Sequence, residues 1–414
     1  MDGILQKVFM DHYRHYQSTH RLSKPMKQAA RALLACRTRA MGGHYQVCPD
    51  GHDMRICYHA CRHRSCPRCH ALPKANWVAA QHAKLLACDH YHVVFTLPHE
   101  LLRLWRYNRH WFTKAMFAAS RDTLFDLLGD ERYLGATPGV IMAFHSWGRT
   151  LSLHPHVHCL VTGGGWSAAG RWRAVNNGYL LPAKVAKAVY RGKLLSAVTA
   201  YLSEGDGVLP AGETLESLRA QLRKLYTKEW NVRIQERYAH GQGVMLYLSR
   251  YIKGGPIEER RIRYRGGDTV DFAYTDHRDH QRKMMHLRAD AFMTRILTHV
   301  PEPGQHQVRH YGLYHAKQQA KRSKVRVILG QSNEAKRPDM HWADYLIGQK
   351  RAQSTVCQQC GAALVSRYHF GRNKNSFIRV PTRMAVADLS NKPLERTLSG
   401  DGGPLFFARG APLN

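Results

Sequence analysis

The chain has 414 residues, and its 62 Lys and Arg against 30 Asp and Glu give a formal net charge of +32 with histidine neutral. A hydrophobic fraction of 44% excludes a disordered chain, and the sequence lacks the apolar run of about 18 residues that a membrane-spanning helix needs. The N-terminal residues do not have the pattern of a signal peptide, so we expect a cytoplasmic protein. This size and charge predict two to four modules and a nucleic-acid partner rather than a membrane surface.

Apolar periodicity and turn residues predict alternating helices and strands along the chain. We expect helices over residues 1–35, 99–130, 183–202, 214–230 and 244–253. We expect strands over residues 91–97, 140–146 and 156–162, the last ended by the three glycines at 163–165. A basic hairpin region is expected over 260–290, with a turn at Gly266 and Gly267, and the tail from 331 is less regular.

Five of the ten cysteines lie between Cys48 and Cys69, which predicts a metal site because thiols stay reduced in the cytoplasm. Cys66-Pro-Arg-Cys69 has the spacing of a zinc knuckle, whose two thiolates bend onto one ion. The second pair of ligands is left open between Cys48 with His52 and Cys48 with Cys61. A site with four protein ligands has no open position, so the zinc expected here is structural.

The other cysteines carry weaker signals. Cys36, Cys88 and Cys159 stand alone and are interpreted as buried small apolar residues. Cys357 and Cys360 form a second pair with knuckle spacing, for which His369 is one candidate partner. Whether this pair binds a second zinc ion is left open.

The segment His154-Pro-His156-Val-His158 predicts a second kind of metal site. Alternate side chains of a strand share a face, so His156 and His158 project together while Val157 faces the core. Two imidazoles hold one divalent ion and leave positions open for a substrate. The alternative is a pair of half-buried histidines without a metal.

Downstream, Tyr247-Leu-Ser-Arg-Tyr251 places two phenols four residues apart, on one face of the expected helix. Tyrosine at helical spacing often packs in a core. Here a separate apolar stripe already supplies core contacts, through Val244, Leu248 and Ile252. We therefore interpret Tyr247 and Tyr251 as candidate nucleophiles toward a metal-bound phosphate.

Together these motifs resemble the rolling-circle transposases of the IS-ninety-one family, which belong to the HUH endonuclease superfamily. The matching segments, in order, are Cys36-Arg-Thr with Gly42-Gly-His44, Cys66-Pro-x-Cys69, Val93-Val-Phe-Thr-Leu-Pro98, His145-Ser-Trp-Gly-Arg149, His154-Pro-His-Val-His158, Tyr247-Leu-x-Arg-Tyr251 and Arg309-x-Tyr-Gly312. The resemblance implies an α+β fold whose HUH-endonuclease domain has a central antiparallel sheet flanked by helices, with a small N-terminal zinc module and a basic C-terminal region. It also implies nicking and rejoining of single-stranded DNA at insertion-sequence ends, through 5′-phosphotyrosine intermediates.

On this reading the chain divides into five regions. They are an N-terminal helical region (1–44), a zinc-binding module (45–80), the HUH catalytic domain with its tyrosine helix (85–256), a basic DNA-contacting region (257–330) and a C-terminal region with the Cys-x-x-Cys pair (331–414).

The resemblance makes His156 and His158 the metal pair, for magnesium or manganese, and leaves two assignments open. Many family members carry a cysteine where this chain has Gly51, so the upstream zinc ligands are left open, with His52, one residue later, as the substitute. The third ligand of the catalytic metal is expected to be His145, with Gln242 as the rival.

Basic runs supply the expected DNA contacts. The candidates are Arg260, Arg261, Arg263 and Arg265 in the hairpin region, Lys321 and Arg322 on a later helix, and Arg250 and Lys253 beside the tyrosines. A solvated surface is the alternative for such runs. The sequence has no phosphate-binding loop, so we expect no nucleotide cofactor, and strand unwinding would fall to a host helicase.

Three other classes of protein compete with this interpretation. A plasmid replication initiator or relaxase shares the chemistry, but in a relaxase the tyrosine typically precedes the histidine pair. A non-enzymatic zinc regulator explains charge and cysteines but not the histidines and tyrosines. A carboxylate-metal transposase needs a trio of clustered acids, and no compelling trio is apparent.

Overall fold

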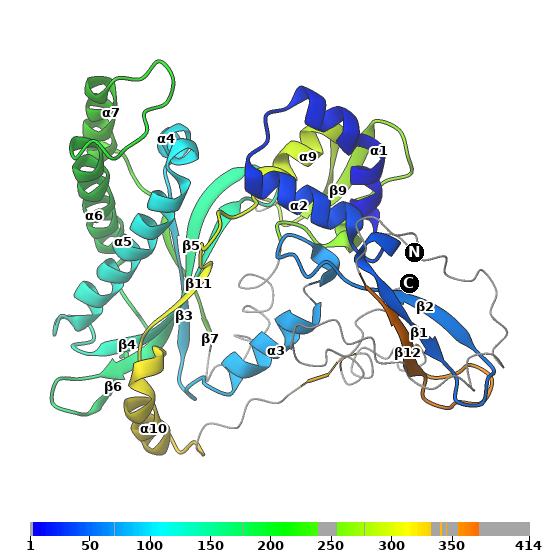
Figure 1. Ribbon diagram of the computed structural model, residues 1–414. Helices are drawn as coiled ribbons and strands as arrows, with labels where there is room; N and C mark the ends of the chain where they lie inside the picture. The colour runs from blue at the N-terminus through cyan, green and yellow to red at the C-terminus, as the bar shows by residue number, and fades with distance from the viewer. Residues whose placement is uncertain are drawn as a thin grey trace.

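The computed structural model describes residues 3–69, 71–176, 178–238, 255–276, 278–332, 340–341, 345 and 355–371 (Figure 1). These parts of the chain form three antiparallel sheets and a set of helices. The α+β class with an antiparallel central sheet and helices is therefore confirmed. None of the helices in the described ranges combines the length and the hydropathy that spanning a membrane requires.

The largest sheet has six strands, all paired antiparallel, in the order β11-β4-β5-β3-β7 with β6 beside β5. Its strands are β3 (His90–Thr96), β4 (Thr137–Trp147), β5 (Leu153–Trp166), β6 (Trp172–Ala174), β7 (Val232–Tyr238) and β11 (Val308–Gly312). The predicted strands at 91–97, 140–146 and 156–162 are β3, β4 and β5. Because β5 is the third strand of five along the main path, its side chains have neighbours on both sides.

One face of this sheet packs against helices. The helices are α4 (Leu102–Tyr107), α5 (Arg109–Gly129), α6 (Ala183–Ser203) and α7 (Leu215–Thr227). Every second side chain of the central strands is apolar, for example Phe95 on β3, Phe144 on β4 and Val157 on β5, and these join one hydrophobic core with the helices. Figure 1 shows the helices stacked on this side of the sheet. The intervening side chains, including the histidines of β5, therefore project from the opposite face.

A second core combines the two halves of the chain. It contains α1 (Ile4–Thr19), α2 (Lys24–Ala35), the sheet of β8 (Ile262–Arg263), β9 (Thr269–Thr275) and β10 (Arg282–Arg288), and α9 (Ala289–Thr298). The expected N-terminal helical region and the expected basic region after residue 256 therefore contribute side chains to the same core. The guanidinium of Arg295 donates to the carbonyl of Thr150, which ties this module to the turn between β4 and β5.

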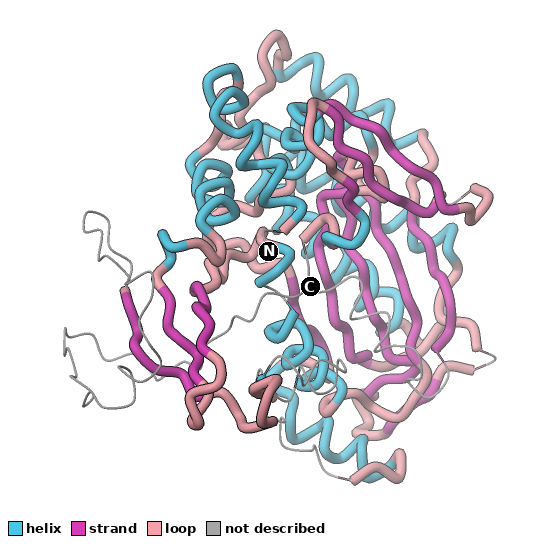
Figure 2. The backbone as a smooth tube through the Cα atoms, turned by 90° about the vertical axis from the view of Figure 1, so that its right-hand side faces the viewer, coloured by secondary structure: helices cyan, strands magenta, loops and turns pink. Residues whose placement is uncertain are grey.

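The third sheet is small and stands apart from the large one in both views (Figures 1 and 2). It pairs β1 (Gly43–Val47) with β2 (Met54–Tyr58) on one side and with β12 (Val365–Phe370) on the other. α3 (Ala71–His82) leads from this region to the large sheet. α10 (Gln319–Ile328) packs on a third apolar cluster, which also contains side chains of β4 and β5.

Two expectations for local structure are corrected. The helical region expected over 1–35 is two helices, with Pro25 in the first turn of α2. The glycines at 163–165 do not end β5, which continues to Trp166. A Cβ on Gly165 would lie 2.7 Å from the carbonyl oxygen of Thr137. These glycines therefore allow close approach of neighbouring strands instead of a turn.

Candidate metal centres and DNA-contacting residues

Three histidines from two adjacent strands converge on the face of the large sheet opposite the helices. His145 on β4 lies directly across from His156 on β5, and His158 follows two residues later on the same face. Their ligand nitrogens all lie within 4.8 Å of one another, and all three side chains are buried. The structure thus brings His145 together with the expected metal pair, while its rival Gln242 lies outside the described residues.

The hydrogen bonds of His156 set its tautomer. Its Nδ1 lies 2.6 Å from the carbonyl oxygen of His154, which can only accept, so Nδ1 carries the proton. Its Nε2 therefore keeps a lone pair, and lies 2.8 Å from Nε2 of His158. Two nitrogens bound to one ion at about 2.0–2.1 Å each would be about 2.8–3.4 Å apart. The separation of the two nitrogens is therefore one at which both could hold the same ion.

Burial keeps the imidazoles of His156 and His158 neutral. Loss of hydration lowers the pKa of His156 and of His158 well below the usual value, and the neighbouring histidines, His145 among them, lower both further. A neutral imidazole is the form that binds a metal. At neutral pH, protons therefore do not compete for the ligand nitrogens of His156 and His158.

A fourth histidine, His92 on β3, supports the cluster and was missed from the sequence. Its Nε2 lies 2.9 Å from Nδ1 of His158, and the two rings are stacked. If His158 uses Nε2 toward a metal, its Nδ1–H donates to His92, which fixes the ring. The alternation His90-Tyr-His92 was the available signal, but only the pairing of β3 with β5 shows which histidine His92 faces.

We expect His92→Ala to weaken manganese binding at the cluster by about 10–100-fold, because outer ligand partners orient the ring that binds. Isothermal titration with manganese measures this. His90→Ala is the matched control, since His90 is buried on the same strand but bonds Tyr314 and the carbonyl of Cys88. His92→Gln should restore part of the affinity by keeping an acceptor. Equal losses in His92→Ala and His90→Ala would contradict a positioning role.

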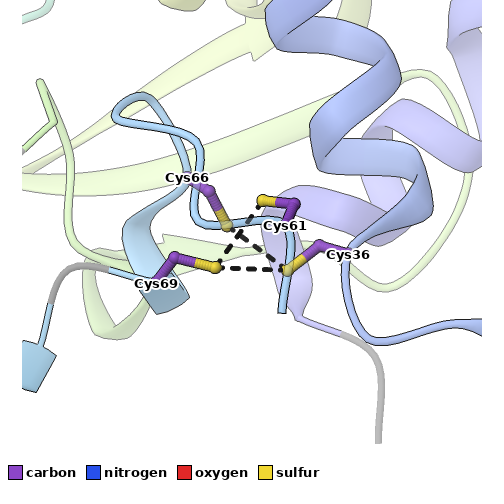
Figure 3. Close-up of side chains that lie close together, drawn as sticks. All are labelled: Cys36, Cys61, Cys66 and Cys69. Carbon is purple, nitrogen blue, oxygen red and sulfur yellow. Dashed lines mark hydrogen bonds between the residues drawn. The ribbon is translucent and has the colours of Figure 1, made fainter. Parts of the chain in front are cut away.

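Four cysteines form the first sulfur cluster (Figure 3). Sγ of Cys36 lies 3.5 Å from that of Cys69 and 3.7 Å from that of Cys66, and Sγ of Cys61 lies 3.6 Å from that of Cys69. A disulfide would need about 2.05 Å, whereas tetrahedral zinc with bonds of about 2.3 Å places sulfurs about 3.8 Å apart. The cluster therefore fits zinc. Hydrogen bonds among these sulfurs lower the pKa of Cys36 and raise those of Cys61 and Cys66.

The single zinc site expected from the sequence is divided between two clusters. Cys61, Cys66 and Cys69 do come together, but Cys36 is their fourth partner, although its isolation had suggested a plain buried residue. Cys48 and His52 lie in a second cluster with Cys357 and Cys360. Sequence spacing found the local pairs, whereas the partners come from segments that only the fold brings together.

His369, the candidate partner for Cys357 and Cys360, lies elsewhere. It groups with His44 and His59 at the opposite end of the small sheet. Both ring nitrogens of buried His44 lack a hydrogen-bond partner among the described residues. Burial first, then the neighbouring His369 and His59, lowers the pKa of His44 to about 4, so this ring is neutral at pH 7.

The basic hairpin residues are placed unequally. Arg263 on the edge strand β8 is exposed, and so is Arg265, two residues after that strand. Arg260 is exposed and pairs with Glu258. The guanidinium of Arg261 instead donates to the carbonyls of Ala273 and Arg149. Arg261 therefore helps to hold β8 in place, which leaves the other three better placed for phosphate contacts.

The expected DNA-contacting pair on α10 is likewise corrected. Lys321 is exposed, but Arg322 is buried and donates to the carbonyl of Leu313. Arg326 on the same helix is also buried and donates to the carbonyl of Leu85. One face of this cationic helix therefore satisfies backbone carbonyls of neighbouring loops rather than facing a phosphate backbone. Tyr247, Tyr251, Arg250 and Lys253 lie outside the described residues.

Two segments of the chain match families of known proteins. Residues 8–97 match a family described as "Transposase zinc-binding domain" and residues 139–323 one described as "Putative transposase". "Putative transposase y4qJ" of Sinorhizobium fredii is 32% identical over 366 residues, covering 85% of this chain and 92% of that protein. The chain belongs to the IS-ninety-one family of transposases. It carries the N-terminal zinc-binding domain of that family.

A second relative agrees with this membership. The "Transposase for insertion sequence element IS801" of Pseudomonas savastanoi pv. phaseolicola is 27% identical over 344 residues, covering 80% of this chain and 81% of that protein. The "Putative transposase" match begins at Gly139 on β4 and ends beyond β11, so it contains the three clustered histidines.

Proposed function

We propose that this transposase nicks and rejoins single-stranded DNA at the ends of its insertion sequence, by rolling-circle transposition through a 5′-phosphotyrosine intermediate. The observation that carries the proposal is the convergence of His145, His156 and His158 at one buried point of an antiparallel sheet. Such a sheet, with the histidine pair on its central strand, suits the HUH-endonuclease domain proposed for residues 85–256.

The three histidines would hold a divalent ion, and Nε2 of His156 has its lone pair available for it. We propose manganese or magnesium, with manganese favoured because magnesium prefers oxygen ligands and the cluster offers nitrogen. Bound there, the ion would withdraw charge from the scissile phosphate. The sheet strands fix the imidazoles, so the site needs little rearrangement to bind.

Tyr247 and Tyr251 are the proposed nucleophiles. A phenolate oxygen attacks phosphorus, the bond to the 3′ oxygen breaks, and that oxygen leaves and takes up a proton as a 3′-OH. The ordinary tyrosine pKa is near 10, so the phenol must lose its proton to a neighbouring base on attack. Rejoining reverses the step: a 3′-OH attacks the phosphotyrosine and the phenol is released. The phosphodiester energy is conserved, so no nucleotide cofactor is required.

Positive charge supports the DNA-binding part of this proposal. The chain has a net charge of +32. Arg263 on β8, an edge strand of the β8-β9-β10 sheet, and Arg265 just after that strand are exposed. Cations in such positions bind the phosphate backbone by releasing counterions. The four-cysteine cluster fits structural zinc, since four thiolates leave no position for a substrate.

The test is a covalent adduct. Purified protein is incubated with manganese and labelled single-stranded DNA from an element end, denatured, and examined by gel and by peptide mapping. We expect DNA attached to Tyr247 or Tyr251. Phenylalanine keeps the ring and removes only the hydroxyl, so the double variant Tyr247→Phe/Tyr251→Phe should bind DNA and form no adduct. DNA attached outside residues 244–253 would overturn the assignment.

A further inference from the structure

We propose that Cys48, His52, Cys357 and Cys360 bind one structural zinc ion, which fastens the C-terminal segment 355–371 to the N-terminal zinc-binding domain. This site is separate from the four-cysteine cluster and does not depend on the proposed DNA chemistry. Cys357 and Cys360 lie outside both matched family ranges, 8–97 and 139–323. Sequence spacing alone left their partners open.

The ligand geometry fits zinc. Sγ of Cys48 lies 3.4 Å from Sγ of Cys360 and 3.8 Å from Nδ1 of His52, and all four ligand atoms lie within 4.8 Å of one another. Zinc bonds of about 2.3 Å to sulfur and about 2.0 Å to nitrogen imply ligand separations of about 3.5–3.8 Å in a tetrahedron. The sulfurs are too far apart for a disulfide, which needs about 2.05 Å. Three cysteines with one histidine are a common structural zinc set.

Two unrelated segments form matching turns at the site. The N–H of Cys48 donates to the carbonyl of Asp53 at 2.8 Å, and the N–H of Cys357 donates to the carbonyl of Ala362 at 2.8 Å. In both turns the backbone N–H of a cysteine thus donates a hydrogen bond to the carbonyl of the residue five positions later. Each turn also contains a glycine at positive φ, Gly51 at 80° and Gly361 at 76°, whose N–H donates to the carbonyl of the same cysteine. Both turns are therefore closed around their ligands, as zinc knuckles are.

The sheet places the two turns side by side. β1 is the middle strand, paired with β2 and with β12, and Val47 at its end lies opposite Val365 at the start of β12. The first turn joins β1 to β2, and the second directly precedes β12. The guanidinium of Arg55 on β2 also donates to the carbonyl of Val356. The four ligands thus meet at one end of the three-stranded sheet. Cys48 and Cys360, which lie side by side there, are 312 positions apart in the sequence.

This sheet lies outside the three hydrophobic cores. Among the described residues, no member of β1, β2 or β12 belongs to any of the three hydrophobic core clusters. Ile56 on β2 and Val365 on β12 are 41% and 42% exposed. Small sheets without a core need a metal or a disulfide to stay folded, and the cysteines here are unpaired. A zinc ion at the ligand cluster supplies that missing stabilisation.

The experiment uses the full chain with cobalt in place of zinc. Absorption from thiolate-to-cobalt charge transfer reports only ions bound to cysteine, so ions on histidine clusters do not contribute. Two cobalt ions should show seven thiolate bonds, four from the first cluster and three from this site. Cys360→Ala should lose all three bonds of this site, not one. Because Cys360 is exposed, its truncation costs little buried contact and acts through the metal.

The pairing across the chain is tested by a double variant. If Cys48 and Cys360 hold the same ion, Cys48→Ala/Cys360→Ala should lose no more absorption than either single variant. Cys66→Ala with Cys360→Ala should lose both ions. Cys57→Ala is the control, because Cys57 is buried in β2 of the same sheet and belongs to neither cluster. Hydrogen exchange of residues 365–370 should speed up in Cys360→Ala and not in Cys57→Ala.

Three results would overturn the proposal: full absorption in Cys360→Ala, additive losses in the Cys48→Ala/Cys360→Ala variant, or unchanged exchange in β12 after loss of the ion. None of these results bears on cleavage at the histidine cluster. Failure of this proposal and failure of the proposed function are therefore distinguishable.

Discussion

Alanine at both His156 and His158 is expected to reduce cleavage of single-stranded end DNA by at least about 1,000-fold, while DNA binding stays nearly unchanged. Metal polarisation of a phosphate contributes several kcal/mol, and about 4 kcal/mol corresponds to about 1,000-fold in rate. Binding should persist because the substitutions change neither the exposed Arg260, Arg263 and Arg265 nor the cysteine clusters. Single-turnover cleavage and fluorescence anisotropy, on the same DNA with added manganese, measure the two effects.

The matched control is His310→Ala. His310 lies on β11 of the same sheet, paired in register with Ile141, and bonds Oε1 of Gln81 instead of the cluster. It therefore tests the loss of a partly buried histidine from this sheet without removing a ligand. The interpretation fails if the double variant cleaves at the wild-type rate, or if the wild-type protein cleaves as fast in a strong chelator as in manganese.

The histidine site shows what local sequence reasoning can and cannot reach. Alternation along β5 is a local property, so it placed His156 and His158 on one face correctly. His145 is eleven positions away, and its position opposite His156 depends on the register between β4 and β5. His92 depends on a further pairing, that of β3 with β5, and short-range patterns contain no information about it.

The cysteines show the same limit more strongly. Knuckle spacing identified Cys66 with Cys69 and Cys357 with Cys360 as pairs, because two ligands on one turn are a local feature. Which pairs share an ion is decided by topology. Cys36 follows α2 and reaches the first cluster only because the second core folds α2 against α1 and α9. Reasoning along the chain therefore paired Cys48 with His52 correctly but grouped that pair with Cys66 and Cys69, whereas the structure groups it with Cys357 and Cys360.

From the sequence we interpret the runs of basic residues as DNA contacts. Burial divides these residues into exposed ones and ones whose side chains bond backbone carbonyls inside the protein. Arg322 and Arg326 lie four residues apart on α10, and both point into the protein to bond loop carbonyls. Lys321, next to Arg322, is exposed. Periodicity alone could have suggested a buried face through Val325, but a buried arginine is rare enough that the sequence favoured the surface.

Loss of the first zinc ion should unfold the module built on α1, α2 and α9. Cys36 and Cys66 are each 1% exposed and belong both to the metal cluster and to this hydrophobic core. Zinc binding free energy at a structural site is folding free energy, about 10–16 kcal/mol in zinc-finger peptides. Cys66→Ser should therefore destabilise the module by far more than the about 1–3 kcal/mol that a poorly bonded buried hydroxyl costs.

The measurement is thermal unfolding by circular dichroism together with hydrogen exchange of residues 4–19 and 289–298. In Cys66→Ser both helices should lose protection together, because α1 and α9 pack on each other and share one core with the cluster.

Cys88→Ser is the control: Cys88 is also buried, but it lies outside every metal cluster among the described residues. Cys88→Ser should lower the free energy of unfolding by no more than the about 1–3 kcal/mol that a poorly bonded buried hydroxyl costs, and it should keep its zinc. If Cys66→Ser keeps its zinc, or loses it while α1 and α9 remain protected, the cluster does not stabilise this core. The helices would then fold by apolar packing alone.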